Sequence, residues 1–339
     1  MRSLAAFAMG GRARALLLAV ASAGSLLFAW FAAALIALVT LRKGIAEGFQ
    51  LLLWSTLPAL VLLRVTGDST VLALIVGTAV LAMVLRTSTS LALAVLATTV
   101  VALATAALTA AFAGAMLDEL VQVFRDFLGN LQAQGSADGA ELEFRVPTPL
   151  LLAGMIGTAN GLLCFFCLVL ARYWQAGLYN PGGFGVEFRA LRYPPAVAWG
   201  LGLGALGLIS AGFDWRSWGA ALLLPLTIAG FALLHAWARQ RGQGSFWLGA
   251  VYVGWVVFDA AKLVLIGLAL ADALLDFRQR WRGPGGGPGG PDGGPGAPPA
   301  APGQDAAPRQ DAERDRTGGP QNGSESDRGD SDSDRDRDR

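Results

Sequence analysis

Two opposite charges stand three residues apart in the apolar stretch WVVFDAAKLVLIG, Asp259 and Lys262. On a continuous helix they share one face, and Tyr252 lies about 20° from Asp259 on that face. Charges at bilayer depth are costly, so they normally face the bundle interior and pair there. The pair therefore predicts either a cavity that binds a polar or ionic ligand or relays protons, or an internal ion pair that fixes helix register.

Another polar side chain, Asn160, stands in the middle of the apolar segment GMIGTANGLLC. The glycines Gly157 and Gly161 around it allow another helix to approach closely. We expect Asn160 to lie at the depth of Asp259 and near the ion pair, which gives a candidate ligand-binding site of Asp259, Lys262, Asn160 and Tyr252. The alternative is a packing face of small residues that belongs to no site.

Other residues that could do chemistry are few. The C-x-x-C of Cys164 and Cys167 could indicate redox chemistry or half a metal site, but it lies in an apolar run without a nearby His or acid, where cysteine behaves as a small hydrophobe. The single histidine, His235, precedes Arg239 and Arg241 and is expected to anchor a helix end at the interface. No hydrolase, metalloprotease or nucleotide-binding motif is present. The sequence therefore predicts no enzyme activity, no metal and no cofactor.

Long apolar runs must position these residues. The chain is 54% hydrophobic and 15% charged, and a bilayer core of about 30 Å requires about 20 helical residues to cross it. The runs are continuous, without the alternation of transmembrane strands. We predict an all-α polytopic transmembrane bundle of about eight spans, or seven if residues 70 to 85 form a re-entrant turn. The predicted spans are residues 15 to 41, 45 to 63, 70 to 85, 91 to 117, 149 to 171, 195 to 213, 218 to 237 and 246 to 275.

Two polar segments complete the organisation. Within the transmembrane domain, residues 1 to 282, the connection 118 to 148 begins with apolar residues at helical spacing. It is either a surface helix that lies on the membrane or docks a partner, or an extension of the preceding span that ends at Gly129. Residues 283 to 339 are Gly/Pro-rich and then Asp/Arg-rich, a composition that predicts a disordered tail.

The charge balance constrains partners and orientation. Residues 1 to 282 hold 19 bases and 13 acids, without a basic patch interleaved with aromatics, so nucleic acid is not expected as a partner. With eight spans the 18 bases outside the predicted spans divide 10 to 8 between the two sides, so the positive-inside rule gives little support to either orientation. We expect a cytoplasmic N-terminus because Arg2, Arg12 and Arg14 precede the first span.

The C-terminal third resembles a known family. FALLHAWARQRG at 231 to 242 and GLALADALLDFRQRWR at 267 to 282 are similar to the closing pattern of the YybS-like family of bacterial polytopic membrane proteins, a domain of unknown function. The resemblance implies a fold distantly similar to the substrate-binding components of energy-coupling-factor vitamin transporters, in which about six spans surround a small-molecule pocket. The matching positions are His235, Arg239, Arg241, Gly267, Asp272, Asp276, Phe277, Arg278 and Arg280.

These observations favour a multi-spanning protein of a bacterial inner membrane. We expect a small-molecule-binding or transport component without its own ATPase, whose partners are the lipid bilayer and a protein in the membrane. The alternative is a membrane scaffold or assembly protein that acts through residues 118 to 148 and the tail. An intramembrane enzyme is the third hypothesis.

Overall fold

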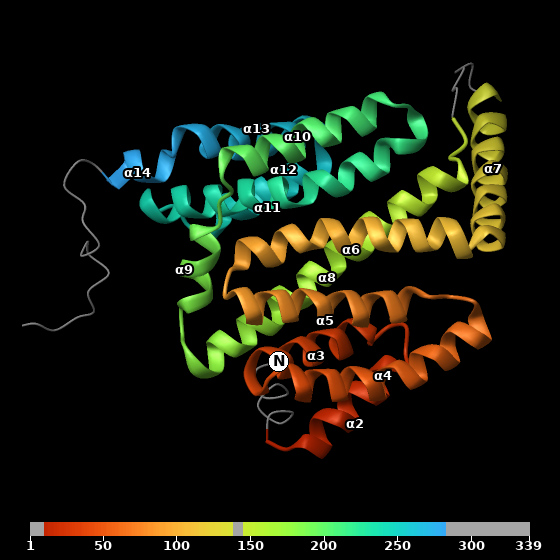
Figure 1. The fold of residues 1–339 in the computed structure, drawn as a ribbon. Helices are drawn as coiled ribbons and strands as arrows, with labels where there is room; N and C mark the ends of the chain where they lie inside the picture. Colours follow the sequence, from red (N-terminus) through yellow and green to blue (C-terminus); the bar gives the residue numbers. More distant parts are fainter. Residues whose placement is uncertain (1–9, 138–144, 283–339) are drawn as a thin grey trace, which may run out of the picture. The chain divides into compact units, whose positions relative to one another are not determined.

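The computed structural model describes residues 10–137 and 145–282, and in this part of the chain every regular element is helical (Figure 1). The prediction of an all-α fold is therefore confirmed. The tail predicted to be disordered, and residues 138–144 of the polar connection, lie outside the described residues. The elements are α2 (Arg12–Ala23), α3 (Ala29–Lys43), α4 (Ile45–Thr66), α5 (Thr70–Ser88), α6 (Leu91–Phe112), α7 (Gly114–Ala137), α8 (Pro149–Tyr179), α9 (Gly183–Ala190), α10 (Pro195–Ser210), η1 (Phe213–Trp215), α11 (Arg216–Gln240), α12 (Ser245–Val257), α13 (Asp259–Leu275) and α14 (Phe277–Arg282).

Five helical segments of the described chain are long and apolar enough to cross a membrane: α4, α5, α6, α8 and the continuous stretch Phe213–Gln240. A sixth is present if α12 and α13 form one broken span. Helix α5 runs unbroken over 19 residues, which favours a span over a re-entrant turn there. The structure thus has fewer candidate spans than the predicted eight or seven, because two predicted spans are broken and α10, with 16 residues, is short.

The predicted first span, residues 15 to 41, is two helices. Helix α2 ends at Ala23 and α3 begins at Ala29. At the start of α2, Arg12 forms an ion pair with Glu47 in the first turn of α4, and α3 ends immediately before α4. The start of α2 and the end of α3 therefore both lie near the start of α4, so α2 and α3 form a hairpin. Every residue from Ala32 to Leu41 in α3 is buried, as expected for a helix that is apolar all round.

The predicted last span, residues 246 to 275, is also broken. The backbone of Phe258 is extended, with φ −113° and ψ 120°, and α12 and α13 meet there at a bend of 115°. The prediction of one tilted helix is wrong. The break makes Asp259 the first residue of α13, where the helix dipole favours a negative charge. Helix α13 packs on α11, with Leu265 against Gly230.

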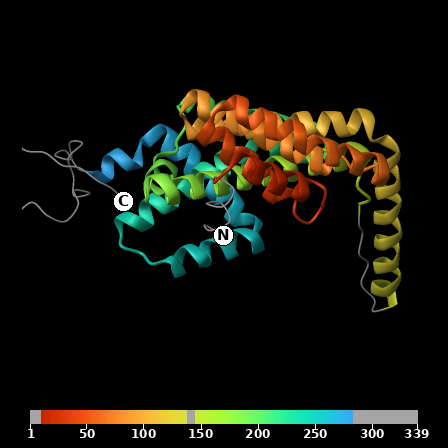
Figure 2. The same ribbon diagram turned by 90° about the horizontal axis from the view of Figure 1, so that it is seen from below.

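Helix α7 is separate from α6. The two helices are divided at Ala113, and α7 turns away from the direction of α6 (Figures 1 and 2). It continues past Gly129 to Ala137, so the alternative of a simple span extension is wrong. Its apolar residues Leu117 and Val121 pack against the beginning of α8, while its polar face points away, as in helices that lie on a membrane surface.

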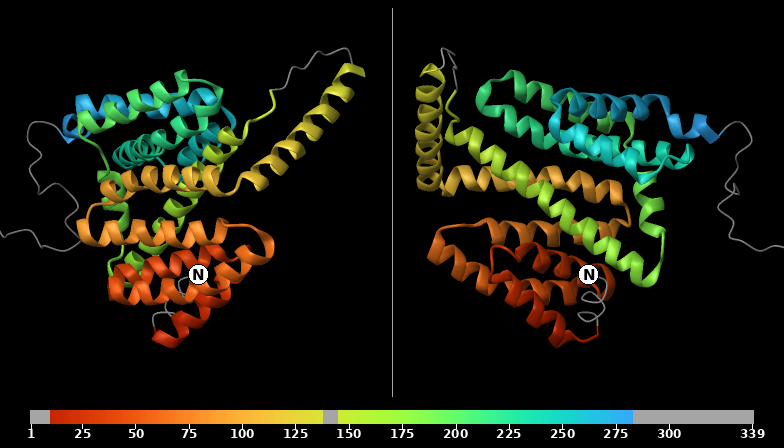
Figure 3. Two further views of the ribbon diagram at one scale, coloured as in Figure 1. Left: turned by 45° about the vertical axis from the view of Figure 1, so that its right-hand side comes forward. Right: turned by 180° about the vertical axis from the view of Figure 1, so that it is seen from behind.

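Helix α8 holds the bundle together. It has 31 residues, runs diagonally across the bundle in the foreground of the right-hand view of Figure 3, and packs against α3, α5, α6 and α11. It approaches α6 closely at two glycines: a Cβ on Gly157 would lie 2.3 Å from the Ala102 carbonyl oxygen, and one on Gly161 would lie 2.8 Å from the Ala102 Cβ. Only glycine at these two positions permits this approach.

Helix ends gather at two levels. Helices α3, α5, α8, α11 and α13 end at the level where α4, α6 and α10 begin. Contacts between these termini connect them: Tyr193 Oη donates to the Ala92 carbonyl at 3.1 Å, and Gln240 Nε2 donates to the Trp281 carbonyl at 3.1 Å. We call this level the arginine-rich end. Among the described residues it carries 13 bases, namely Arg12, Arg14, Arg42, Lys43, Arg86, Arg172, Arg189, Arg192, Arg239, Arg241, Arg278, Arg280 and Arg282.

The acids are distributed differently. The arginine-rich end carries 4 acids among the described residues, namely Glu47, Glu187, Asp272 and Asp276. The opposite end carries 4 bases there, which are Arg64, Arg125, Arg145 and Arg216, and 5 acids, which are Asp68, Asp118, Glu119, Asp126 and Asp214. The fold thus concentrates positive charge at one end, although the positions along the chain predicted a nearly even division.

Candidate functional site

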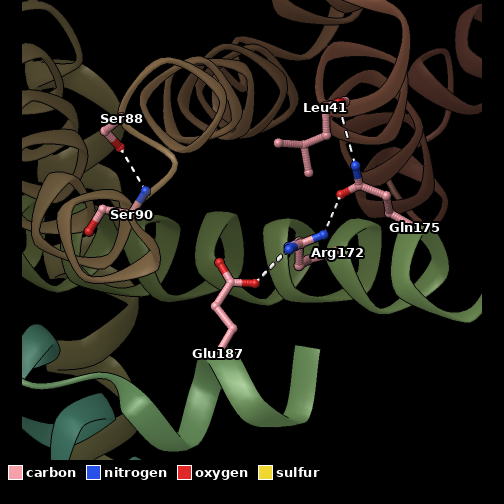
Figure 4. Close-up of polar contacts among 6 residues, drawn as sticks. All are labelled: Leu41, Ser88, Ser90, Arg172, Gln175 and Glu187. Carbon is pink, nitrogen blue, oxygen red and sulfur yellow. Dashed lines mark hydrogen bonds and ion pairs between the residues drawn. The ribbon is translucent and has the colours of Figure 1, made fainter. Parts of the chain in front are cut away.

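A polar cavity of about 390 Å³ lies at the arginine-rich end, between the ends of α3, α5 and α8 and the short helix α9 (Figure 4). Such a volume lies within the range of small-molecule sites. Two of its lining residues are arginines and one is an acid. The cavity is lined by Leu41, Leu85, Arg86, Thr89, Arg172, Gln175 and Glu187.

Arg172 is the centre of the polar network in Figure 4. Its Nε donates to Glu187 Oε2 at 2.9 Å, and its Nη2 lies 2.7 Å from the same oxygen. Its Nη1 donates to Gln175 Oε1 at 2.8 Å. About three quarters of both charged side chains is removed from solvent, with 24% of Arg172 and 22% of Glu187 exposed. The pair therefore ties α9 to α8 in a partly desolvated setting.

Another polar contact closes the cavity on the side of α3. The Leu41 carbonyl, in the last turn of α3, accepts from Arg86 Nη1 at 2.6 Å and from Gln175 Nε2 at 3.5 Å. A terminal carbonyl lacks a partner within its helix, so a cation beside it is favourable. Nearby, the Ser90 N–H donates to Ser88 Oγ at 3.2 Å, which fixes the turn between α5 and α6.

The chemistry of the cavity follows from its charges. The lining holds two guanidinium groups and one carboxylate, so it carries one excess positive charge. Guanidinium groups bind carboxylate and phosphate oxygens with two parallel hydrogen bonds. Glu187 is carried by α9, a helix of 8 residues preceded by Gly182 at φ 87°. An anion that pairs with Arg172 would compete with Glu187.

The sequence pattern did not identify Arg86, Arg172 and Glu187 as site residues. They are up to about a hundred positions apart, form no motif, and each stands near the end of an apolar run, where a base is ordinarily an interface anchor. The signal in the sequence was that Arg86 and Arg172 each follow a long apolar run. This signal could not show that the ends of the two runs meet.

An apolar groove of about 920 Å³ lies between α5 and α6 and extends to the beginning of α7. Its walls include Val76, Val80, Val100 and Leu108, all exposed. Both helices are candidate spans, and the lining of the groove is mostly apolar.

The predicted ion pair forms, but not in the interior. Lys262 Nζ lies 2.7 Å from Asp259 Oδ1, and the two side chains are 43% and 94% exposed. The prediction of an interior-facing stripe is wrong because the break at Phe258 removes the continuous helix on which that geometry rested. For the same reason Tyr252, on α12, does not share a helix face with Asp259.

Asn160 and the ion pair are not brought together. Asn160 Nδ2 donates to Thr105 Oγ1 of α6 at 3.0 Å, and the glycines on either side of Asn160 face α6 rather than α13. The predicted neighbour was wrong, and the alternative of a small-residue packing face is confirmed. The Asn160 Oδ1 atom is buried without a hydrogen-bond partner.

Tyr252 and His235 belong to an aromatic cluster between α11 and α12. Tyr252 stacks on Phe231 with ring centroids 4.7 Å apart, and its hydroxyl lies 3.4 Å from His235 Nε2. His235 Nδ1 lies 2.8 Å from the Phe231 carbonyl oxygen, and Phe188 of α9 packs edge-on against the imidazole. His235 thus has partners on α9, α11 and α12, which connects the helices at this level.

Several residues of the C-terminal pattern form an ionic cluster at the end of α13. The buried Asp272 accepts from the Phe277 N–H at 3.2 Å and lies 3.5 Å from Arg278 Nε. Asp276 pairs with Arg192, whose hydrogen bond holds the pKa of Asp276 below its usual value. Of the remaining pattern residues, Arg239 and Arg280 are exposed and Arg241 lies 5.5 Å from the centroid of a neighbouring tryptophan ring. The cluster ties the end of α13 to the start of α10.

The two cysteines are structural in character. Both are buried, and the Cys164 and Cys167 thiols lie 3.6 Å and 3.5 Å from backbone carbonyl oxygens of α5 and α3. Within residues 10–137 and 145–282, no three His, Cys, Asp or Glu side chains are grouped so as to hold a metal ion.

Comparison of the chain with models of protein families, with curated proteins and with solved structures finds no match in any of the three. The resemblance of the C-terminal third to the YybS-like family therefore stays a prediction, and the function has to be inferred from the geometry.

Proposed function

We propose that this protein is a membrane-embedded binding or transport component that takes a small anionic or zwitterionic solute into the cavity at the arginine-rich end. The observation that carries the proposal is the meeting of Arg86 and Arg172 around a volume of about 390 Å³ with one carboxylate to balance them. The sequence contains no nucleotide-binding motif, so transport would require energy from a partner or a gradient.

The contacts of Arg172 suggest how the solute is accommodated. A solute carboxylate or phosphate replaces Glu187 on the guanidinium, and α9 then moves with the released carboxylate. Arg86 supplies the second positive group, held in place by the Leu41 carbonyl. Glu187 pairs with Arg172, so this guanidinium keeps a counter-charge until the anion of the solute replaces the carboxylate.

A thermal-shift screen tests this proposal. The purified full-length protein is heated with phosphate, small carboxylates or amino acids, and at least one is expected to raise the unfolding temperature. A solute at about 100 times its dissociation constant stabilises the folded state by about 2.7 kcal/mol. Arg172→Gln should abolish the shift, measured against the variant's own unfolding temperature.

The matched control is Arg239→Gln, which removes an exposed arginine of the same end that does not line the cavity. It should retain the solute-dependent shift. The proposal is wrong if no anion stabilises the wild-type protein, or if both variants respond as the wild type does.

We further propose that the arginine-rich end faces the cytoplasm of a bacterial inner membrane. The support is the difference between the ends, with 13 bases against 4 among the described residues, since cytoplasmic segments carry the excess of Lys and Arg. The first described helix begins and the last one ends at this level, so under this proposal both of these ends lie on the cytoplasmic side. The solute cavity then opens toward the cytoplasm.

Reporter fusions test this orientation. A green fluorescent reporter fused behind Arg282 should fluoresce, whereas alkaline phosphatase at the same position should be inactive, because it folds only outside the cytoplasm. A fusion in the α4–α5 loop, at Gly67, serves as the control and should give the reverse result. Phosphatase activity behind Arg282 would contradict the orientation.

Helix α7 favours a second candidate function, that of a membrane scaffold. Its residues Val123 and Phe127 are exposed on a helix that packs on α8 through its other apolar residues. A partner could cover these side chains. Under this alternative the cavity has no solute, so the thermal-shift screen described above gives no response in any variant.

A further inference from the structure

The Asp259–Lys262 pair lies at membrane depth on the outside of the bundle. Helices α11 and α13 both run toward the arginine-rich end, and Leu265 packs against Gly230. Asp259 stands six residues before Leu265, and Leu224 stands six residues before Gly230. Asp259 is therefore level with Leu224, inside the candidate span Phe213–Gln240. Even so, the Asp259 side chain is 94% exposed.

The surface around the pair is apolar. Among the described residues of α12 none is buried, and Figure 2 shows this helix at the edge of the bundle. The large side chains beside the break are 60% to 69% exposed: Val253, Val256, Val257, Phe258, Leu263 and Val264. An apolar face of this kind is ordinary beside lipid, but an ion pair in its middle is not.

Exposed charges at this depth require a polar cover. Ionised side chains in membrane segments face the bundle interior or a water-filled cavity, because hydrocarbon does not solvate them. Within residues 10–137 and 145–282, the one side-chain hydrogen bond of the pair joins Lys262 Nζ to Asp259 Oδ1. The remaining hydrogen-bonding capacity of the carboxylate and the ammonium group points outward.

We propose that a second copy of this chain covers the pair, related by a two-fold axis that passes between the two charges. In such an interface the same patch faces itself, so Asp259 of each copy lies opposite Lys262 of the partner subunit. The patch is self-complementary because it carries one acid and one base within a single helical turn. A different partner would have to supply its own acid and base at the same spacing. The interface uses α12 and α13, and neither helix lines the solute cavity. The proposed dimer is therefore independent of the proposed solute binding.

Charge reversal tests the interface in the full-length protein. Wild-type protein in phosphatidylcholine vesicles is expected to be dimeric by single-molecule photobleaching. Asp259→Lys places two bases in the patch and Lys262→Asp places two acids there, so each variant alone should dimerise about tenfold more weakly or worse.

The two variants together provide the decisive measurement. When they are co-expressed with different fluorescent labels, mixed dimers should form to the wild-type extent, and the double variant with both reversals should dimerise with itself. A folding defect cannot produce this recovery. Monomeric wild-type protein, or single variants that remain apart when mixed, would overturn the proposal.

Discussion

Replacing Gly157 by alanine is expected to destabilise the protein strongly. The added Cβ would lie 2.3 Å from the Ala102 carbonyl oxygen and 2.7 Å from the Ala106 backbone nitrogen, both backbone atoms of α6 that cannot move aside separately. The contact between α6 and α8 must therefore open. Overpacking of this kind costs about 1 to 3 kcal/mol, and the measurement is the unfolding temperature of the purified protein in detergent.

The matched control is Gly207→Ala on α10, where a Cβ meets no heavy atom within 4 Å. Both substitutions bring the same gain in helix propensity, about 1 kcal/mol. Gly207→Ala should therefore leave the unfolding temperature unchanged or raise it. Equal behaviour of the two variants would show that the α6–α8 contact is not as close as described.

Removal of the Asp272 carboxylate is expected to have an effect at least as large. Asp272 and Arg278 are 5% and 12% exposed and lie 3.5 Å apart, and the three guanidinium nitrogens of Arg278 are buried without hydrogen-bond partners. Asp272→Ala would leave this cation without its nearest counter-charge. Breaking a buried pair in this way costs about 3 to 5 kcal/mol, seen as a lower unfolding temperature and reduced yield of folded protein.

Two further variants separate loss of the ion pair from loss of the side chain. Asp272→Leu combined with Arg278→Met removes both charges and should recover most of the stability, because apolar residues of similar volume replace buried pairs without great cost. Asp276→Ala removes the more exposed neighbouring pair with Arg192 and should change stability by about 1 kcal/mol or less. A double variant as unstable as Asp272→Ala would contradict the explanation.

This cluster also gives the C-terminal sequence pattern a physical role. Asp272, Asp276 and Arg278 tie the end of α13 to the start of α10 through Arg192, while the aromatic contacts of His235 connect α9, α11 and α12. Residues of this C-terminal pattern thus connect the helices at the arginine-rich end. The polar cavity lies beside it and uses other residues.

The sequence by itself determined the membrane class and most of the long helices. The apolar runs now seen as α4, α5, α6, α8 and α11 were recognisable because a helix that crosses hydrocarbon must satisfy its backbone internally and expose apolar side chains over about 20 residues. The periodicity of α7 was visible for a similar reason, since one of its faces meets polar surroundings. These properties belong to each segment alone.

Only the tertiary structure decided where the runs break and what meets at their ends. The break at residues 24 to 28 contains Gly24 and Ser25, whereas the break at Phe258 contains neither glycine nor proline. After these breaks α3 is buried, and α13 packs on Gly230 of α11. The Asp259 pair, expected in the interior, lies on the surface. The packing of the helices also brings helix ends from distant parts of the chain to one level, where Arg86, Arg172 and Glu187 line a cavity. Contacts between segments depend on all helices together, and no local pattern encodes them.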